Sequence, residues 1–338
     1  MPIETANTDS NGIASFTKTL YDDDANSLSV EALEVVRTNL TVHDPAKTPN
    51  WLSYTTATRS TQEGPEGNRT YLDVTVEIDT NQLGAGDVHE LRLAATDGFN
   101  TVSQNFRFQN GEFVLENVTD CQILWDPSRE SGGSGYTPTN YGNGNAPAIS
   151  SIDADYVTNV IGEHAGMDVD GGITLGGPLL PTGSSAQPFS LFVVMQNGDY
   201  YDGPRTIIQQ DGGNLDMDLD AKYNNLRYEK DSPDGSFTGR NTDAKHRGDQ
   251  LGLFEYHKRP DETFLVSQGG EKAFSGSDAD PFANGNTTLA YHSEQVQVVL
   301  FAFYMHDLTQ AQVEGIRKQM LMRFPSMPID NIAAPEFA

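Results

Sequence analysis

The sequence predicts an all-β fold of two successive β-sandwich domains, closed by one short helix near the C-terminal end. Short alternating or apolar segments recur along the chain, and clusters of Gly, Asn and Asp separate them. The apolar run Val296–Met305 predicts a buried strand and leads directly into an amphipathic segment at 309–324. A single helix after a long series of short strands is typical of an all-β sandwich.

Length and composition predict four parts. At 338 residues the chain is longer than one ordinary domain, and its 36% hydrophobic residues can build two cores. We expect a polar N-terminal arm over 1–28, a first sandwich over 29–117, a larger sandwich over 118–326 and a C-terminal tail over 327–338.

The first sandwich is predicted from an alternating segment and a turn. Apolar Leu72, Val74, Val76 and Ile78 alternate with polar Asp73, Thr75, Glu77 and Asp79. This period of two is typical of a half-buried strand. The cluster Thr96–Asn100 (TDGFN) predicts the turn of a hairpin further along the chain.

The second sandwich is predicted from a buried strand, a loop and the closing helix. Residues 188–195 (PFSLFVVM) form an apolar run typical of a strand buried on both faces, whereas the Gly/Ser/Asn-rich residues 128–149 predict a long loop inside this domain. Thr309 and Gln312 form a capping box at the start of the helix. Its apolar stripe is Val313, Ile316, Met320 and Phe324, and Arg317, Lys318 and Arg323 complement the helix dipole.

Two parts of the chain resemble known families. Trp51-Leu52-Ser53, the strand TYLDVTVEID and the segment QLGAGDVHELRLAATDG are similar to a BACON-type immunoglobulin-like domain. The segments PFSLFVVMQ, FLVSQGGEKAF and VQVVLFAFYMHDLTQAQVEGIRKQMLMRF resemble the laminin-G-like branch of the concanavalin A-like lectin/glucanase jelly roll. These resemblances imply an immunoglobulin-like β-sandwich over 29–117 and a concanavalin A-like jelly-roll domain over 118–326. The closing strand departs from the second family, with Phe301-Ala302 where many relatives carry a carboxylate.

Charge and cysteine content exclude several classes of partner. The 48 acidic and 21 basic residues give a formal net charge of −27, which repels phosphate backbones, so we expect no nucleic acid partner. The sequence has no apolar stretch long enough for membrane insertion and no N-terminal secretory signal. The single cysteine, Cys121, lies in an apolar-rich neighbourhood, which favours a small buried thiol over a nucleophile.

The sequence gives little support for catalysis. Glucan-hydrolysing relatives carry E-x-D-x-x-E on one strand, because an acid and a nucleophile must face the same cleft. Glu77, Asp79 and Gln82 come nearest to this pattern, but Gln82 cannot donate the proton and the segment lies outside the jelly roll. We therefore expect no catalytic residues and no enzyme.

Calcium is the cofactor that the sequence suggests. Asp216, Asp218 and Asp220 alternate along one segment, so three carboxylates share one face, where a calcium ion or a solvated surface would relieve their repulsion. Residues 168–172 (DVDGG) and 278–280 (DAD) are further loop candidates for such an ion.

Carbohydrate binding requires exposed aromatic rings beside carboxylates or amides. Tyr200, Tyr201 and Asp202 satisfy this requirement at a predicted turn, as does Tyr141 in the Gly/Asn-rich loop. Packing of these tyrosines onto the sandwich is the alternative.

The architecture favours a non-enzymatic virion structural protein of a tailed bacteriophage, such as a capsid decoration, head fibre or tail fibre protein. The N-terminal arm would bind other virion proteins of the capsid or tail, and the jelly roll would bind host-surface glycans. We expect a homo-oligomer at the virion surface, folded in the host cytoplasm. A carbohydrate-binding or adhesion module of a bacterial surface protein and a glycoside hydrolase remain as alternatives.

Overall fold

The chain divides into two compact units, which are described separately below. The computed structural model describes residues 3–4, 7–8, 11–22, 27–39, 41–42, 49–64, 67–83, 87–111, 113–160, 164–181, 183–197, 204–210, 216–220, 225–229, 239–241, 251–279, 282, 285–291, 296–324 and 327–333. The first unit is Met1–Phe113 with Lys318–Pro325, and the second is Val114–Arg317 with Ser326–Ala338. The predicted all-β class is confirmed, since the described residues form many strands and one α-helix.

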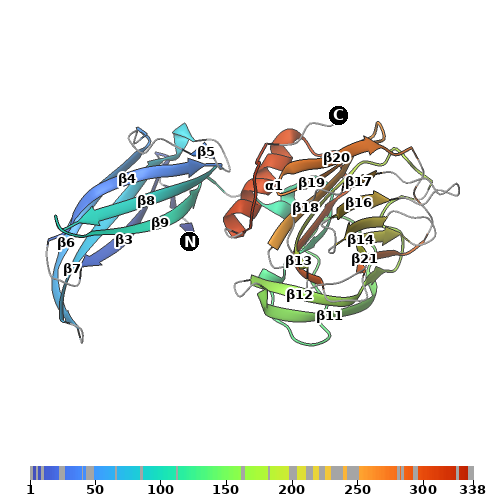
Figure 1. Ribbon diagram of the computed structural model, residues 1–338, viewed down its shortest axis with the longest axis horizontal. Helices are drawn as coiled ribbons and strands as arrows, with labels where there is room; N and C mark the ends of the chain where they lie inside the picture. The colour runs from blue at the N-terminus through green and yellow to red at the C-terminus, as the bar shows by residue number, and fades with distance from the viewer. Residues whose placement is uncertain are drawn as a thin grey trace. The chain divides into compact units, whose positions relative to one another are not determined.

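The first unit is a sandwich of two sheets (Figure 1). One sheet has the order β1-β9-β8-β4-β5, and the other has the order β2-β3-β7-β6. The strands are β1 (Ile3–Glu4), β2 (Asn7–Thr8), β3 (Ile13–Asp22), β4 (Ser29–Thr38), β5 (Thr41–Val42), β6 (Leu52–Gly64), β7 (Gly67–Asp79), β8 (Val88–Thr96) and β9 (Thr101–Gln109). Phe16 of β3 and Phe106 of β9 meet edge-to-face at 5.3 Å, which joins the inner faces of the two sheets.

The alternating strand and the hairpin turn of this unit are as predicted. The four apolar residues of β7 are at most 2% exposed, and their polar neighbours are half-buried. The turn after β8 begins at Asp97, whose Oδ1 accepts hydrogen bonds from the backbone N–H groups of Phe99 and Asn100.

The predicted N-terminal arm is wrong over Ile13–Asp22, which forms strand β3. This strand pairs with β7 along its whole length. Its inward positions include Lys18, which is 8% exposed and places its ammonium group 5.1 Å from the centroid of the Phe106 ring. The aliphatic part of a lysine side chain can cover apolar surface in this way. Because a charged residue occupies an inward position, the sequence of this strand does not show a clear apolar–polar alternation.

The second unit is a larger sandwich in which strand β12 takes part in two layers. Met167–Val169 of β12 pair with β22, whereas Ile173 and Thr174 pair with β21. The strands are β10 (Cys121–Trp125), β11 (Ile149–Val160), β12 (His164–Leu175), β13 (Phe189–Asn197), β14 (Pro204–Gln210), β15 (Asp216–Asp220), β16 (Asn225–Glu229), β17 (Gly239–Asn241), β18 (Leu251–Lys258), β19 (Thr263–Gln268), β20 (Glu271–Ser277), β21 (Thr287–Tyr291) and β22 (Val296–Tyr304). Short 3-10 helices lie at Thr80–Gln82 in the first unit and at Leu115–Asn117 and Pro127–Arg129 in the second.

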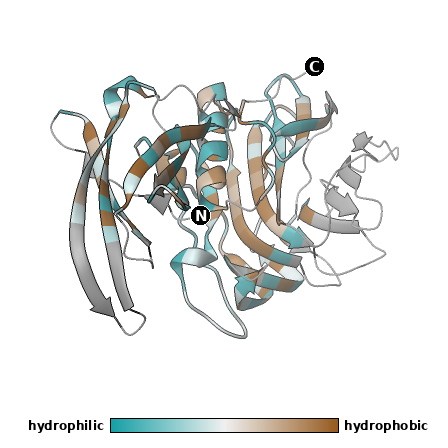
Figure 2. Ribbon diagram, turned by 60° about the vertical axis from the view of Figure 1, so that its left-hand side comes forward, coloured by the Kyte–Doolittle hydropathy of each residue, from teal (hydrophilic) through white to brown (hydrophobic). Residues whose placement is uncertain are grey.

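Strand β13 is buried on both faces, as predicted. Alternate residues such as Leu191 and Val193 face the main core of the unit, while Phe192 lies on the opposite face at 0% exposure. Helix α1 (Gln310–Arg323) covers that second face, because Arg317 forms a buried ion pair with Glu255 of β18, the register partner of Phe192. Figure 2 shows the apolar residues of the strands in brown.

Helix α1 begins and packs as predicted, with one exception. Gln312 N–H donates to Thr309 Oγ1 and the Gln312 side chain accepts from Thr309 N–H, which completes the capping box. The predicted apolar stripe is buried at all four positions. The exception is Arg317, which was predicted to complement the helix dipole. Its side chain is 0% exposed and pairs with Glu255 instead.

The described part of the C-terminal tail packs on the second unit. Ile329 and Ile332 are 5% and 7% exposed, and Asp330 N–H donates to the carbonyl oxygen of Gly269. Gly270, which follows Gly269, has a φ of +85°. A Cβ atom at Gly270 would lie 1.9 Å from the Asn331 oxygen. Only glycine allows this turn to approach the tail so closely.

Candidate functional site

Four polar side chains form a row across neighbouring strands of the second unit. The register places Asp155 of β11 opposite Asp168 of β12, Asp168 opposite Gln297 of β22, and Gln297 opposite Gln196 of β13. Residues in register on adjacent strands share a face of the sheet. We call these four residues the polar row. Sequence reasoning missed the row, because the members come from four segments between residues 155 and 297.

The polar row lies on the face of the sheet opposite the main core. Its sequence neighbours Met167, Met195 and Val298 belong to that core, and successive residues of a strand point to opposite faces. On the row's own face, Val194 and its register partner Leu300 are 0% exposed. The row therefore marks a change from a buried apolar surface to a half-exposed polar one.

Asp168 has an unusual electrostatic environment within the row. Burial raises its pKa, the nearby Asp170 and Asp155 carboxylates raise it further, and a hydrogen bond from Gln297 opposes the rise. Its Oδ1 atom is buried and has no hydrogen-bond partner among the described residues. Carboxylate and amide groups in one line offer both acceptors and donors, which is the chemistry that recognises hydroxyl groups.

The predicted sugar-binding turn comes shortly after Gln196 of the polar row in the sequence. Tyr200, Tyr201 and Asp202 lie outside the described residues, but β13 ends at Asn197, next to Gln196. The sugar-binding role of these three residues therefore stays a prediction.

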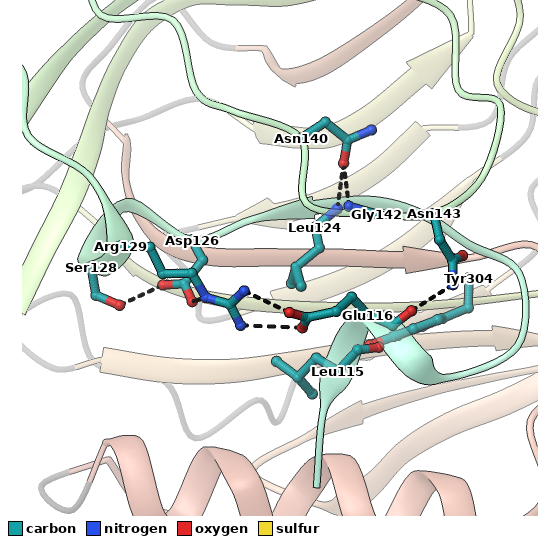
Figure 3. A network of polar contacts seen from close by, with 10 residues as sticks. All are labelled: Leu115, Glu116, Leu124, Asp126, Ser128, Arg129, Asn140, Gly142, Asn143 and Tyr304. Carbon is teal, nitrogen blue, oxygen red and sulfur yellow. Dashed lines mark hydrogen bonds and ion pairs between the residues drawn. The ribbon is translucent and has the colours of Figure 1, made fainter.

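The predicted residue Tyr141 lies elsewhere, between Asn140 and Gly142, which are two residues of the polar network drawn in Figure 3. The Arg129 guanidinium stacks 4.9 Å from the Tyr141 ring centroid, and Tyr141 N–H donates to Leu124 of β10. No described hydrogen bond or ion pair joins Tyr141 to the polar row. Tyr136 of the same loop belongs to the core, at 7% exposure.

Arg129 is the centre of that network. It forms two hydrogen bonds with Glu116, at 2.7 and 3.2 Å, and one with the fully buried Asp126, at 2.8 Å. These bonds lower the pKa of Glu116 and raise that of Arg129. Figure 3 shows that Arg129 lies between the two carboxylates, while Ser128 donates to Asp126. The network ties the loop to strand β10, and its ionic groups are already satisfied by one another.

Cys121 is a buried thiol, as predicted. It is 0% exposed, and burial, with the Glu116 charge as a smaller cause, raises its pKa to about 12. A thiol with this pKa is almost entirely protonated at neutral pH and is a poor nucleophile.

The calcium predictions have different outcomes. Asp216, Asp218 and Asp220 form strand β15, but their side chains lie outside the described residues, so this site stays a prediction. Residues 168–172 are not a loop but part of β12. Asp278 is also wrong as a candidate ligand, because its Oδ2 pairs with the buried Lys258 at 2.8 Å. Among the described residues, no group of three acidic, His or Cys side chains could hold a metal ion.

A buried Ser–His contact does not form a catalytic site. Ser190 Oγ and His257 Nδ1 are 3.0 Å apart on the face of the sheet that helix α1 covers. Burial lowers the pKa of His257 to about 4, so the imidazole is neutral at pH 7. Both side chains are at most 6% exposed, which prevents a substrate from reaching them. Asp79, from the segment that only approaches the E-x-D-x-x-E pattern, accepts hydrogen bonds from Asn81 and Gln82.

Comparisons with known proteins give only distant likenesses. No protein-family model matches the sequence, and no similar curated protein is found. The binding domain of botulinum neurotoxin serotype D has a TM-score of 0.45 and 9% identity, over 60% of this chain and 53% of that chain. Domain 4 of an extracellular arabinanase from Geobacillus stearothermophilus, solved with arabinotriose, has a TM-score of 0.42 and 16% identity, over 57% and 96%.

These likenesses do not transfer a ligand or an activity to this chain. The chain spans about half the length of the neurotoxin binding domain that it matches. The TM-scores lie below 0.5 and the identities below 25%. Separately, no helix in the described part of the chain is long and apolar enough to cross a membrane.

Proposed function

We propose that this chain is a non-enzymatic binding protein whose second unit binds saccharides at the polar row. The supporting observation is the row itself: two carboxylates and two amides in register, half-exposed beside a buried apolar surface. Tyr200 and Tyr201, which follow β13 closely, would supply the aromatic rings that stack on a sugar.

The absence of catalysis is part of the proposal. Hydrolysis of a glycosidic bond needs one carboxyl group as acid and another as nucleophile or base. In the second unit, Glu116, Asp126, Glu255 and Asp278 each pair with a cation. Asp155 faces Asp168, but its Oδ1 accepts a hydrogen bond from Gly135 N–H, which suits a positioning role.

We also propose a setting for this binding protein: the virion surface of a tailed bacteriophage. Two β-sandwich units in series and a strongly acidic surface suit a decoration or fibre protein that displays a glycan-binding module. A bacterial surface adhesion module is the alternative. Neighbouring genes for capsid, portal or tail proteins support the first, and neighbouring genes for cell-wall or polysaccharide-use proteins support the second.

Asp168→Asn provides a direct test of the binding site. Screening on a glycan array identifies a ligand, and calorimetry then compares the wild type with Asp168→Asn, Gln297→Ala and the control Glu314→Gln on helix α1. Loss of a hydrogen bond to a charged group weakens binding by roughly 10- to 100-fold. We expect this loss for Asp168→Asn, a smaller loss for Gln297→Ala, and none for the control.

The same variant separates a binding defect from a folding defect. Because burial raises the pKa of Asp168, its charge costs stability above the ordinary pKa of an aspartate, and this cost disappears at lower pH. Asp168→Asn should therefore be at least as stable as the wild type at pH 7. Unchanged affinity in Asp168→Asn would contradict the site, and release of reducing sugar from a polysaccharide would contradict the non-enzymatic assignment.

A further inference from the structure

Strand β6 of the first unit has an open edge. In the described part of the chain, β6 pairs only with β7. The six side chains from Ser53 to Thr58 are all exposed, including Tyr54 at 43%. No described residue outside β7 forms a hydrogen bond with these six residues. We call Ser53–Thr58 the β6 edge.

The inner face of the sheet is also uncovered at this edge. Tyr54 and Thr56 lie beside Val76 and Val74 of β7, which are both 0% exposed. The opposing sheet therefore covers β7 and Leu52 but does not extend over Tyr54 and Thr56 of β6. A strand placed beside β6 would gain backbone hydrogen bonds and would also shield Tyr54 and the edge of the core.

Two other described edges carry features that discourage pairing. Strand β4 has Glu31 and Glu34 and two irregularities in its register. Strand β11 has Asp153 and Asp155 and three irregularities. Edge strands commonly avoid association through such charges and bulges. The β6 edge has neither, because its register is continuous from Leu52 to Arg59.

Strand β9 is a competitor among the described edges. It is also uncharged over Thr101–Phe106, but Val102 and Gln104 are half-buried, and β1 runs beside its last residues. The β6 edge, by contrast, is exposed on both faces over six consecutive residues.

We infer that the β6 edge pairs antiparallel with the β6 edge of a second copy of this chain, across a twofold axis at Thr55. This arrangement places Thr55 opposite Thr55, Tyr54 opposite Thr56 and Ser53 opposite Ala57. Such a contact is isologous, so the same residues serve both copies. Threonine pairs on neighbouring strands are favourable, and a tyrosine beside a β-branched residue is favourable too.

Self-complementarity is the reason that the partner is a second copy, since every residue of the edge meets an uncharged partner across the axis. Each copy carries a formal net charge of −27, so two copies can associate only through a surface that keeps carboxylates away from the contact. Residues 52–58 contain no charged side chain. The nearest carboxylates in register are Glu77 and Asp73, one strand further in, opposite Ser53 and Ala57. Salt screens their repulsion across the axis, so association should strengthen as salt is raised.

Charged substitutions at the twofold axis test this pairing in the full chain. Light scattering after size exclusion, over a series of concentrations, should show a monomer–dimer equilibrium for the wild type. Thr55→Lys alone and Thr55→Glu alone should each weaken dimerisation at least tenfold, because like charges meet at the axis. Mixing the two variants should restore a dimer, which native mass spectrometry identifies as the mixed species. Ser103→Lys, on the β9 edge, is the matched control and should dimerise as the wild type does.

Three results would overturn the inference. The first is a wild type that stays monomeric at roughly millimolar concentration in high salt. The second is a dimer that Ser103→Lys disrupts while Thr55→Lys does not. The third is a mixture of the Lys and Glu variants that forms no mixed species. The result does not depend on saccharide binding, since the polar row lies in the other unit.

Discussion

The edges of strands β10 and β6 contrast within one chain. Strand β10 pairs with β22 on one side, and residues 140–145 lie along its other side. Tyr141 and Gly144 donate backbone hydrogen bonds to Leu124 and Cys121, both at 2.9 Å. Strand β6 has no such cover among the described residues. The protein therefore closes one edge with its own chain and leaves the other able to accept a strand.

The difference depends on the segment that follows each strand. After β10, a Gly/Asn-rich loop returns along the free edge, and its small residues fit against the strand. Asn140 acts as a substitute peptide group there: its Oδ1 accepts from Leu124 N–H and its Nδ2 donates to the Gln122 oxygen. After β6, the chain turns directly into β7, so it returns on the side that is already paired. Covering an edge thus requires a loop of suitable composition and a return path on the free side.

Displacing the loop that covers the β10 edge should have the largest effect on the free energy of unfolding. A Cβ atom at Gly142 would lie 2.7 Å from the Cys121 oxygen and 2.8 Å from the Gln122 oxygen. Both are backbone atoms of β10, so Gly142→Ala should displace the loop and cost about 1–3 kcal/mol of unfolding free energy. Urea unfolding followed by tryptophan fluorescence measures this cost. A Trp51→Phe background leaves Trp125, on β10 itself, as the reporter for the second unit.

Gly133→Ala is the matched control for this substitution. A Cβ atom at Gly133 would meet nothing within 4 Å. Its effect should lie between zero and a small gain in stability, because alanine restricts the unfolded chain. Equal stability of the two alanine variants would show that close approach of the loop to β10 does not stabilise the second unit. We also expect Gly142→Ala to aggregate more readily, because its β10 edge becomes open.

A smaller loss of stability should follow from changing Asn140, whose side-chain amide takes the place of a peptide group beside β10. Asn140→Ala removes the hydrogen bonds from Leu124 N–H and Gly142 N–H and the one to the Gln122 oxygen. Leu124 is 0% exposed, and a buried N–H left without a partner costs about 1–3 kcal/mol. Water can partly replace the exposed Asn140, so we expect about 1–2 kcal/mol in the same unfolding assay.

Asn140→Asp divides this effect between the two ends of the amide. Aspartate keeps acceptors for Leu124 and Gly142 but loses the donor to Gln122. It should therefore cost less than Asn140→Ala. A larger cost in the aspartate variant would mean that the bond to the Gln122 oxygen, rather than the two accepted bonds, holds the cover in place.

Local patterns predicted the elements of this fold well. The alternation in β7, the capping box at Thr309 and the stripe through Ile316 each depend on residues a few positions apart, and all three are confirmed. The composition of residues 128–149 predicted a loop in the second domain, which is where it lies. Composition could not show that this loop covers β10, because that depends on which strand ends at the edge of the sheet.

The candidate site was less predictable because it depends on long-range register. Asp155 and Asp168 look like ordinary polar residues of a half-exposed strand, and Gln196 and Gln297 lie near the ends of two apolar runs. Only the pairing of four strands brings them into one row. The Arg317–Glu255 ion pair has the same origin, since its partners are 62 residues apart. The pattern of aromatic rings beside carboxylates pointed to the turn after β13 but to none of the four row residues.

The smallest effect on stability should come from the ion pair between Arg129, at the start of the 128–149 loop, and Glu116. The Glu116 side chain is 27% exposed, and hydrogen bonds from Arg129 lower its pKa. A carboxyl group with a lowered folded-state pKa adds stability above its unfolded pKa, and this stability is lost as the pH falls through the folded value. Solvent screening limits the contribution to about 0.5 kcal/mol. Glu116→Gln should therefore be less stable than the wild type by about that amount at pH 7, and the difference should vanish once the pH falls below the lowered folded-state pKa of Glu116. A difference that persists unchanged into acid would show that the Glu116 side chain stabilises the loop by packing rather than by charge, and that cover of the β10 edge depends on its glycines and Asn140 alone.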